Sequence, residues 1–412
     1  MKERIYFREK YLARLRPFYD SDVVKVITGI RRCGKSFILK SVIEELKGKV
    51  SSERIIHLPL DARGFNKLET PEDLENAISA LIESDERHYI FIDEVQNIAG
   101  FEKTVLAFQE EGHSIFLSGS NSYLLSDDIS TKLTGRYLNF EILTLDFREY
   151  VEMKRFFGKK TGDLQDEFEK YMLNGGFPKS LEFDGDEAVR TYVKGIIGEI
   201  FHKDVSVRHR VSGMALYERI QSFVIGNYSS AFSLSSLYDN LVKEGIGTKI
   251  ETVRKYIRFL EKAKIIYECN RFDLKSKRAL KREQKYYLAD LSISFSMSVD
   301  NRLNLGKSLE NLVFMYFLGK NYEVSIGKIG DLECDFIIRK TDGDYAYVQV
   351  AYSLQAGDER STEELQEREY RPFRLIRDSY PCYIITLDRF AERRDGVRHI
   401  NAIDLLFGKS EL

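Results

Sequence analysis

The sequence has 412 residues. A single hydrophobic core rarely extends over so long a chain, so we expect roughly two to four domains. Its 63 basic and 65 acidic residues leave a net charge of −2, which excludes an overall charge that would attract nucleic acid or membranes. The four cysteines are scattered without a CxxC pair, which excludes a disulfide framework and a zinc site and favours a reducing compartment. Charges throughout the first residues and the lack of a long apolar run predict a cytoplasmic protein without a membrane segment.

The first third of the chain alternates short apolar runs with longer helical patterns. The apolar runs fall at 23–28, 54–60, 88–93 and 114–119. One helical pattern follows the first run, another opens at Thr70 with an N-cap residue and a proline, and a third covers 101–111. This alternation predicts a parallel sheet covered on both faces, so residues 1–145 are interpreted as an α/β core.

The first apolar run leads directly into a complete G-x-x-x-x-G-K-[ST] motif, and an amphipathic helix follows it. In such a P-loop, or Walker A motif, the glycines let backbone N–H groups turn toward phosphates, and the lysine reaches the β- and γ-phosphates. A serine hydroxyl binds Mg²⁺. A chance Gly-Lys-Ser turn lacks this context, so the motif predicts binding of ATP with Mg²⁺. The residues expected to hold them are Gly29, Ile30, Arg31, Arg32, Cys33, Gly34, Lys35, Ser36, Phe37 and, farther along the chain, Ser120.

The apolar run at 88–93 ends in two acidic residues, Asp93 and Glu94, the pattern of a Walker B strand. We expect Asp93 to hold Mg²⁺ together with Ser36, and Glu94 to act as the general base that polarises the attacking water. An apolar strand that ends in Asp-Glu is often only a solvated strand end. The P-loop nearby in the sequence favours the functional interpretation.

Three further polar residues are candidates for contact with the γ-phosphate. Ser120 and Asn121 follow the run at 114–119, where ATPases with a strand between the P-loop strand and the acidic strand place a polar sensor. The alternative is an N-cap for the helix that follows them. Arg136 precedes another strand, and it either reaches a γ-phosphate in its own or a neighbouring subunit or is a surface arginine. The expected catalytic residues are therefore Glu94, Asn121 and Arg136, and an oligomer is compatible with this set.

The rest of the chain divides into three segments. Residues 146–208 have apolar residues at helical spacing around a turn at 174–178, which predicts a small helical lid. Residues 209–290 show helical patterns at 213–225, 234–243 and 249–264, followed by a β-rich stretch. Residues 291–412 return to mixed α/β patterns.

Together these motifs resemble a family of prokaryotic P-loop ATPases of the AAA/ASCE type that join the ATPase core to a C-terminal region of unknown function. The resemblance covers essentially the whole chain, although Asp146 stands where many members have a small residue such as Ser. It implies ATP binding and hydrolysis, without an established substrate. The residues that carry it are 29–36, 91–94, 119–122, 124–125, 133–136, 145–150, 175–178, 203–205 and Arg208.

Residues 209–290 resemble a winged helix. The third helix would lie in the major groove of DNA and the hairpin after it would form a wing on the phosphate backbone. The alternative is a module for protein contacts whose basic residues form a solvated face. The basic residues concerned are Lys249, Arg254, Lys255 and Arg258 on the helix, and Lys275, Lys277, Arg278, Lys281, Arg282 and Lys285 in the hairpin.

Residues 291–412 resemble a degenerate restriction-endonuclease domain of the PD-(D/E)xK type. A helix with Glu310, a strand with Asp335 and a following strand with Gln349 and Ala351 carry the resemblance. Active members have Glu and Lys at the last two positions, because two carboxylates hold Mg²⁺ and the lysine orients or activates water. The replacements favour a structural or nucleic-acid-binding module, with Glu310 and Asp335 as candidates should another group complete the site.

The leading hypothesis is an ATPase whose nucleotide state moves the lid and the winged helix against the core, with nucleic acid or a protein partner as the target. One alternative is a nucleotide-switched binding module with little turnover. Another is an ATP-regulated nuclease.

Overall fold

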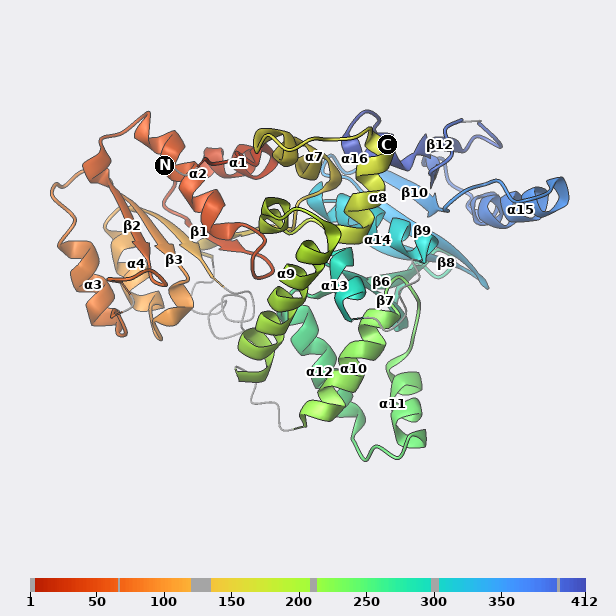
Figure 1. Cartoon of the computed structure of the whole chain (residues 1–412), viewed down its shortest axis with the longest axis horizontal. Coiled ribbons are helices and arrows are strands. Elements are labelled where there is room, and N and C mark those ends of the chain that lie inside the picture. Colours follow the sequence, from red (N-terminus) through yellow and green to blue (C-terminus); the bar gives the residue numbers. More distant parts are fainter. Residues whose placement is uncertain (1–3, 66, 120–134, 208–212, 298–303, 391–392) are drawn as a thin grey trace. The chain divides into compact units, whose positions relative to one another are not determined.

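A computed structural model describes residues 4–65, 67–119, 135–207, 213–297, 304–390 and 393–412. The chain divides into two compact units, one that extends to Thr144 and one that begins at Leu145 (Figure 1). In these described ranges, no helix is both long and apolar enough to cross a membrane.

The first unit is built on a five-stranded sheet whose neighbouring strands are all parallel. The strand order is β2-β3-β4-β1-β5, so β4 lies between the strand that precedes the P-loop, β1, and the strand that ends in Asp93, β3. The predicted α/β core with a parallel sheet is therefore confirmed. The strands are β1 (Val24–Thr28), β2 (Ile55–Pro59), β3 (Tyr89–Asp93), β4 (Ser114–Ser118) and β5 (Tyr137–Glu141).

Both faces of this sheet are buried. Side chains alternate along a strand, so Ile92 of β3 faces an apolar core that includes Leu74 of α3 and Val105 of α4. Phe91 lies on the opposite face, where its ring stacks on that of Phe116 at 4.6 Å between centroids. The helices are α1 (Glu9–Leu15), α2 (Lys35–Lys47), α3 (Pro71–Ser79) and α4 (Glu102–Glu110), with short 3-10 turns η1 (Arg16–Phe18), η2 (Ser52–Arg54) and η3 (Val95–Asn97).

The second unit begins with the helices predicted as a lid. Asp146, where the chain departs from the family pattern, is the N-cap of the first of them. Its carboxylate accepts a hydrogen bond from the Glu149 N–H at 2.8 Å, and the Glu149 carboxylate accepts one from the Asp146 N–H at 3.1 Å. Aspartate therefore caps this helix as serine would. The elements are α7 (Phe147–Phe156), α8 (Leu164–Asn174), η4 (Pro178–Glu182), α9 (Asp186–Glu199) and a π-helical segment η5 (Ile200–Val207).

The turn after α8 attaches these helices to a later part of the second unit. The Gly176 N–H donates a hydrogen bond to the Asp290 carboxylate at 2.7 Å. A Cβ on Gly175 would lie 1.8 Å from an oxygen of the same carboxylate, so glycine is required there. Asp290 directly precedes α13 (Leu291–Met297), which packs against α8 and α9. The lid helices are thus an integral part of the second unit.

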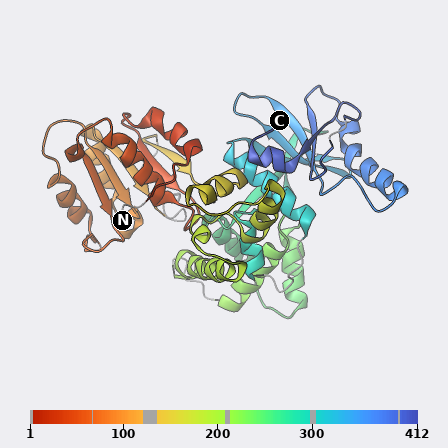
Figure 2. The ribbon, with the colours of Figure 1, turned by 45° about the horizontal axis from the view of Figure 1, so that its top comes forward.

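Three helices and a hairpin lie between the lid helices and α13. The helical patterns predicted at 213–225, 234–243 and 249–264 are confirmed as α10 (Met214–Gly226), α11 (Leu234–Lys243) and α12 (Ile250–Lys262). The hairpin consists of β6 (Ile266–Asp273) and β7 (Arg278–Leu288), which pair in antiparallel orientation. Figure 2 shows the green helices α10 and α11 at one end of the second unit and the blue C-terminal strands at the other.

This hairpin belongs to a seven-stranded mixed sheet of order β12-β11-β10-β9-β8-β6-β7. Because β6 pairs in parallel with β8, strands from the segment predicted as a winged helix and from the predicted C-terminal domain share one sheet. The remaining elements are α14 (Leu305–Gly319), β8 (Glu323–Ile329), β9 (Leu332–Arg339), β10 (Tyr345–Val350), α15 (Glu359–Leu375), β11 (Cys382–Thr386), β12 (Arg398–Asn401) and α16 (Ala402–Phe407).

Candidate functional site

The P-loop connects the carboxyl end of β1 to the start of α2. Gly29 and Gly34 have φ angles of 145° and 106°, which residues with a side chain rarely adopt. Gly29 is also required by space, because a Cβ there would lie 2.1 Å from the carbonyl oxygen of Ile142. The loop therefore has the tight backbone that the motif predicts.

Lys35 is buried, and its ammonium lies inside the loop. Its Nζ donates to the carbonyl oxygens of Gly29 and Ile30, at 3.1 and 3.3 Å. Ser36 and Phe37 follow in the first turn of α2, where the positive end of the helix dipole favours anions. The Phe37 ring is 41% exposed beside this turn. The ammonium of Lys35 and the N-terminus of α2 thus meet at the loop, an arrangement that suits phosphate groups.

Asp93 ends β3 at the same edge of the sheet as the P-loop, since β1, β3 and β4 are parallel. Its buried carboxylate accepts a hydrogen bond from the hydroxyl of Ser118, the last residue of β4. The Ser118 oxygen in turn accepts a hydrogen bond from the Glu94 N–H at 3.3 Å. Ser118 therefore fixes both acidic residues. We did not predict its role, and its signal in the sequence is only a hydroxyl at the end of an apolar run.

Glu94 has a strained backbone. Its φ and ψ angles of 58° and 45° are left-handed, which costs a residue other than glycine about 1–3 kcal/mol. Its carboxylate accepts a hydrogen bond from the Gln96 side chain at 2.5 Å. Strain of this kind persists only where the surrounding structure holds it, and it clusters at functional sites. The geometry therefore agrees with a specialised role for Glu94.

The other predicted catalytic residues do not all lie at this edge. Ser120 and Asn121 are outside the described residues. Arg136 directly precedes β5, which is parallel to β1, so it lies at the opposite edge of the sheet, roughly 16 Å along the strand. Its half-exposed guanidinium forms an ion pair with Glu110 at 2.7 Å. The structure does not bring Arg136 to the P-loop of its own chain, and a role across subunits stays a prediction.

Arg8 links the P-loop to the exit segment, residues 142–144, through which the chain leaves the sheet. The guanidinium of this buried residue donates to the carbonyl oxygens of Cys33, Leu143 and Thr144, at 3.1, 2.9 and 3.1 Å. The first glycine of the loop packs against the same segment. The P-loop is thus linked to the exit segment near both of its ends, directly at Gly29 and through Arg8 at Cys33. No motif in the sequence marks Arg8, and we did not predict it.

Comparison with known proteins identifies relatives of the whole chain. Residues 21–151 match a family model described as an AAA domain, and residues 165–305 match a domain of unknown function, DUF8612. A protein of Haemophilus influenzae, described as uncharacterized, is 30% identical over 98% of this chain and 100% of its own length. The chain belongs to the family of this Haemophilus protein. The uncharacterized protein MJ1544 of Methanocaldococcus jannaschii is 28% identical over 88% of this chain and 82% of its own.

The matched AAA domain coincides with the sheet and the P-loop, so the first unit of this family member is a P-loop domain of the AAA type. Among solved structures, the ORC1 protein of Aeropyrum pernix in complex with DNA has a TM-score of 0.30 and 13% identity, over 72% of this chain and 93% of that one. AMPPCP-bound DnaA from Aquifex aeolicus has a TM-score of 0.30 and 17% identity, over 63% and 89%.

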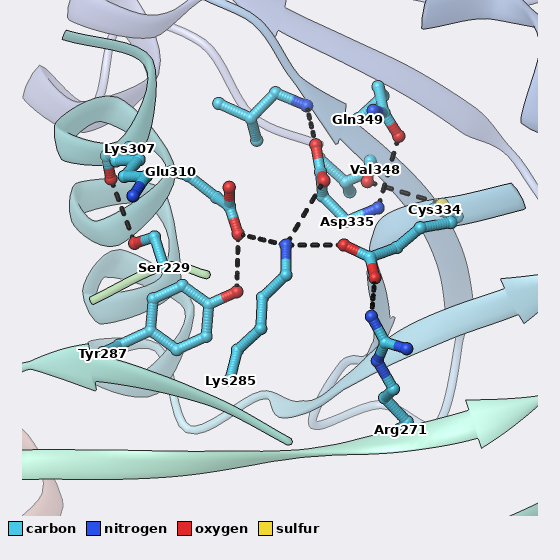
Figure 3. A network of polar contacts seen from close by, with 12 residues as sticks. Ser229, Arg271, Lys285, Tyr287, Lys307, Glu310, Cys334, Asp335, Val348 and Gln349 are labelled. Atoms are coloured by element: carbon cyan, nitrogen blue, oxygen red, sulfur yellow. Dashed lines mark hydrogen bonds and ion pairs between the residues drawn. The ribbon is translucent and has the colours of Figure 1, made fainter. Parts of the chain in front are cut away.

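In the second unit, three carboxylates surround the ammonium of Lys285 on β7 (Figure 3). Its Nζ lies 2.9 Å from Glu310, on α14. It lies 2.6 Å from Glu333 and 3.9 Å from Asp335, both on β9. Arg271 on β6 pairs with the other oxygen of Glu333. The structure thus brings together the predicted residues Glu310 and Asp335, and it adds Lys285, Glu333 and Arg271, which we did not assign to this site.

The two positions at which nucleases of this type need Glu and Lys are occupied differently here. Gln349 accepts a hydrogen bond from the Asp335 N–H at 3.2 Å and donates one to the Glu369 carboxylate at 3.0 Å. Ala351 is buried and pairs through its N–H with β11. Gln349 and Ala351 thus form hydrogen bonds that hold the strands beside the cluster.

Burial and ion pairing oppose each other in the ionisation of this cluster. Burial raises the pKa of Glu310, and it raises the pKa of Asp335 well above the ordinary value, while Lys285 opposes both shifts. Burial alone would lower the pKa of Lys285, but the carboxylates of Glu310, Asp335 and Glu333 outweigh it and raise that pKa. The ammonium is therefore charged at physiological pH and serves as the counter-ion of the carboxylates.

The basic residues predicted to contact DNA do not share one environment. The side chains of Lys281 and Arg282 lie outside the described part of the chain. Lys285 is buried because β7 packs against α14, so its predicted place on a phosphate-binding wing is wrong. The residues that are exposed, on or beside α12 and at the β6–β7 turn, are Lys249, Arg254, Lys255, Arg258, Lys275, Lys277 and Arg278.

Proposed function

We propose that this chain binds ATP with Mg²⁺ in its AAA domain, hydrolyses it, and couples the nucleotide state to engagement of nucleic acid or a protein partner by the second unit. The observation that carries the proposal is the placement of the P-loop, Asp93 and Ser118 at one edge of the AAA-domain sheet. A nucleotide-switched binding module with little turnover would use the same site and is the runner-up.

The residues at this edge fit the proposed ligands. The Ser36 hydroxyl and the Asp93 carboxylate are oxygen donors of the kind that Mg²⁺ prefers, and Lys35 with the N-terminus of α2 provides positive charge for phosphates. When bound, Mg²⁺ neutralises negative charge on the phosphate oxygens. Glu94 takes a proton from the attacking water, and Ser118 holds the Glu94 backbone in place.

Coupling to the second unit would run through the exit segment. Both ends of the P-loop bear on this segment, one through the close approach of Gly29 and the other through Arg8. The segment leads directly into Leu145, and the lid helices that follow pack with α13 in the second unit. A change of the P-loop on phosphate binding would therefore displace the lid together with the rest of that unit.

We assign nucleic-acid contact to the exposed basic residues at α12 and the β6–β7 turn. The net charge of −2 gives the whole chain no attraction for DNA, so such contact must be local. Arg254, Lys255 and Arg258 on α12, and Lys277 and Arg278 at the turn, offer that local charge.

Two substitutions separate nucleotide binding from hydrolysis. Lys35→Ala should abolish ATP binding, measured with a fluorescent ATP analogue. Glu94→Gln should retain binding and lose hydrolysis, measured as phosphate release with and without DNA. The matched control is Lys103→Ala, which removes an exposed lysine of α4 and should behave like the wild type. Wild-type hydrolysis by Glu94→Gln would refute the base assignment, and no turnover by the unmodified chain under either condition would favour the binding module.

A further inference from the structure

The cluster around Lys285 does not fit a divalent-metal site, first because of the position of the ammonium. Its Nζ is 2.9 Å from a Glu310 oxygen and 2.6 Å from a Glu333 oxygen, and Asp335 completes the set at 3.9 Å. A metal shared by these carboxylates would need the same position. A metal there would lie against the ammonium, and the repulsion between the two charges is weakly screened in a buried site.

One oxygen of each of the three carboxylates also binds a donor of the chain other than Lys285. One oxygen of Asp335 accepts a hydrogen bond from the Val350 N–H at 2.8 Å. The Tyr287 hydroxyl donates to Glu310 at 2.7 Å, and Arg271 binds Glu333. Buried carboxylates are stable when paired and hydrogen-bonded, and here Lys285 and Arg271 supply the cationic partners. Consistent with this, the described residues contain no group of three or more His, Cys, Asp or Glu arranged to hold a metal ion.

Gln349 fits the same interpretation. Its amide nitrogen donates to the buried carboxylate of Glu369, and its amide oxygen accepts from the Asp335 N–H. A glutamate at this position has no hydrogen to donate and would place a second negative charge against Glu369. The amide that removes a metal ligand is therefore the group that this hydrogen-bond network requires.

We propose that the Lys285 ammonium is the resident cation of this site. It takes the position that a divalent metal would take, and it joins β7 to α14 and β9 through ion pairs. The site consequently binds no divalent metal and supports no metal-dependent cleavage of phosphodiesters. This inference rests on the contacts of the cluster and is independent of ATP hydrolysis by the first unit.

The test counts bound Mn²⁺ on the full chain without nucleotide, by the loss of the free-ion signal in electron paramagnetic resonance. Lys285→Met keeps an apolar stem of similar length and removes the charge. Its side chain leaves three carboxylates facing one another, and Glu333 is 29% exposed, so solvent ions reach them. Lys285→Met should bind one Mn²⁺ per chain more than the wild type. Adding Asp335→Asn should remove the gain.

The matched control is Lys320→Met, which removes an exposed lysine directly after α14 in the same unit and should gain no Mn²⁺. If Lys285→Met folds and binds no additional Mn²⁺, the proposal is wrong. If Lys285→Met does not fold, Mn²⁺ binding by the wild-type chain tests the proposal by itself. Mn²⁺ bound by the wild type and released by Asp335→Asn would overturn the proposal, and absence of such a site would support it.

Discussion

Lys25 is a buried cation in the first unit, and its replacement should stabilise that unit in a pH-dependent way. It lies in β1 and is 0% exposed, with Nζ donating to the Ser114 hydroxyl at 2.8 Å and to the Ser21 carbonyl oxygen at 3.1 Å. Burial and, to a smaller extent, the charge of Arg87 lower the pKa of Lys25 from 10.5 to about 7, against the opposing effect of Asp20 and Asp22. The uncharged form is therefore the one that the fold accommodates.

The sign of the effect follows from the lowered pKa. Below pH 7 Lys25 is protonated in the folded and the unfolded chain, and folding bears the full cost of burying the charge. Between pH 7 and 10.5 only the unfolded chain is protonated, and this cost falls as the pH rises. At about 1.4 kcal/mol per pKa unit, the cost is roughly 4 kcal/mol at pH 7 and roughly 2 kcal/mol at pH 9. The advantage of Lys25→Met should therefore shrink by about 2 kcal/mol over this interval.

Cys33 provides a measurement specific to the first unit. It is buried there, whereas the other three cysteines lie in the second unit. The rate at which a thiol reagent labels Cys33 at increasing urea, followed by mass spectrometry of its peptide, gives the free energy of opening of this unit. Rates are normalised to the unfolded chain at each pH, because the thiolate fraction rises with pH.

The control is Lys103→Met, on the exposed surface of α4, whose opening free energy should follow the wild type at every pH. The reasoning fails if the wild type and Lys25→Met show parallel pH dependence between pH 7 and 9. It also fails if Lys25→Met is less stable than the wild type at pH 7, because the two hydrogen bonds of the ammonium would then outweigh the cost of its burial.

Further predictions concern the P-loop and the lid. Gly29→Ala should abolish the thermal stabilisation by ATP, because its Cβ would collide with the exit segment. Arg8→Lys should speed Cys33 labelling and weaken nucleotide binding, since the single nitrogen of a shorter side chain cannot reach all three carbonyl oxygens that two guanidinium nitrogens bind; unchanged labelling would contradict this. A fragment that ends at residue 144 should give a dispersed amide NMR spectrum. One that ends at 208 should show unprotected lid amides in hydrogen exchange, because it lacks Asp290 and α13; full protection would count against that packing.

The parts of the fold that local patterns determine were predictable. The apolar run at 88–93 became β3, and the N-cap signal at Thr70 opens α3 with a complete capping box. The P-loop was predictable because one contiguous segment supplies its glycines, its lysine and its helix N-terminus. Asp93 could be predicted to join it, because the carboxyl ends of parallel strands share one edge.

The parts that depend on distant partners were not predictable. Ser118 acts on Asp93 and Glu94 only because β4 lies beside β3. Arg8 acts through backbone carbonyl oxygens, which no residue type reveals. The position of Arg136 could not be predicted either. Its place next to a strand in the sequence does not reveal at which edge of the sheet it lies. The direction of β5 places it opposite the P-loop.

Lys25 and Lys285 show why buried charges are the hardest residues to interpret from sequence. Lys25 stands between valines in an apolar strand and Lys285 stands in a strand rich in charged residues, yet both are buried and their pKa values shift in opposite directions. The Lys25 ammonium is bonded to a hydroxyl and a carbonyl oxygen, so burial prevails and its charge is a cost. The Lys285 ammonium has carboxylates from α14 and β9, so its charge is needed. The same change to methionine should therefore stabilise the first unit and, in the absence of metal, destabilise the second by about 3–5 kcal/mol.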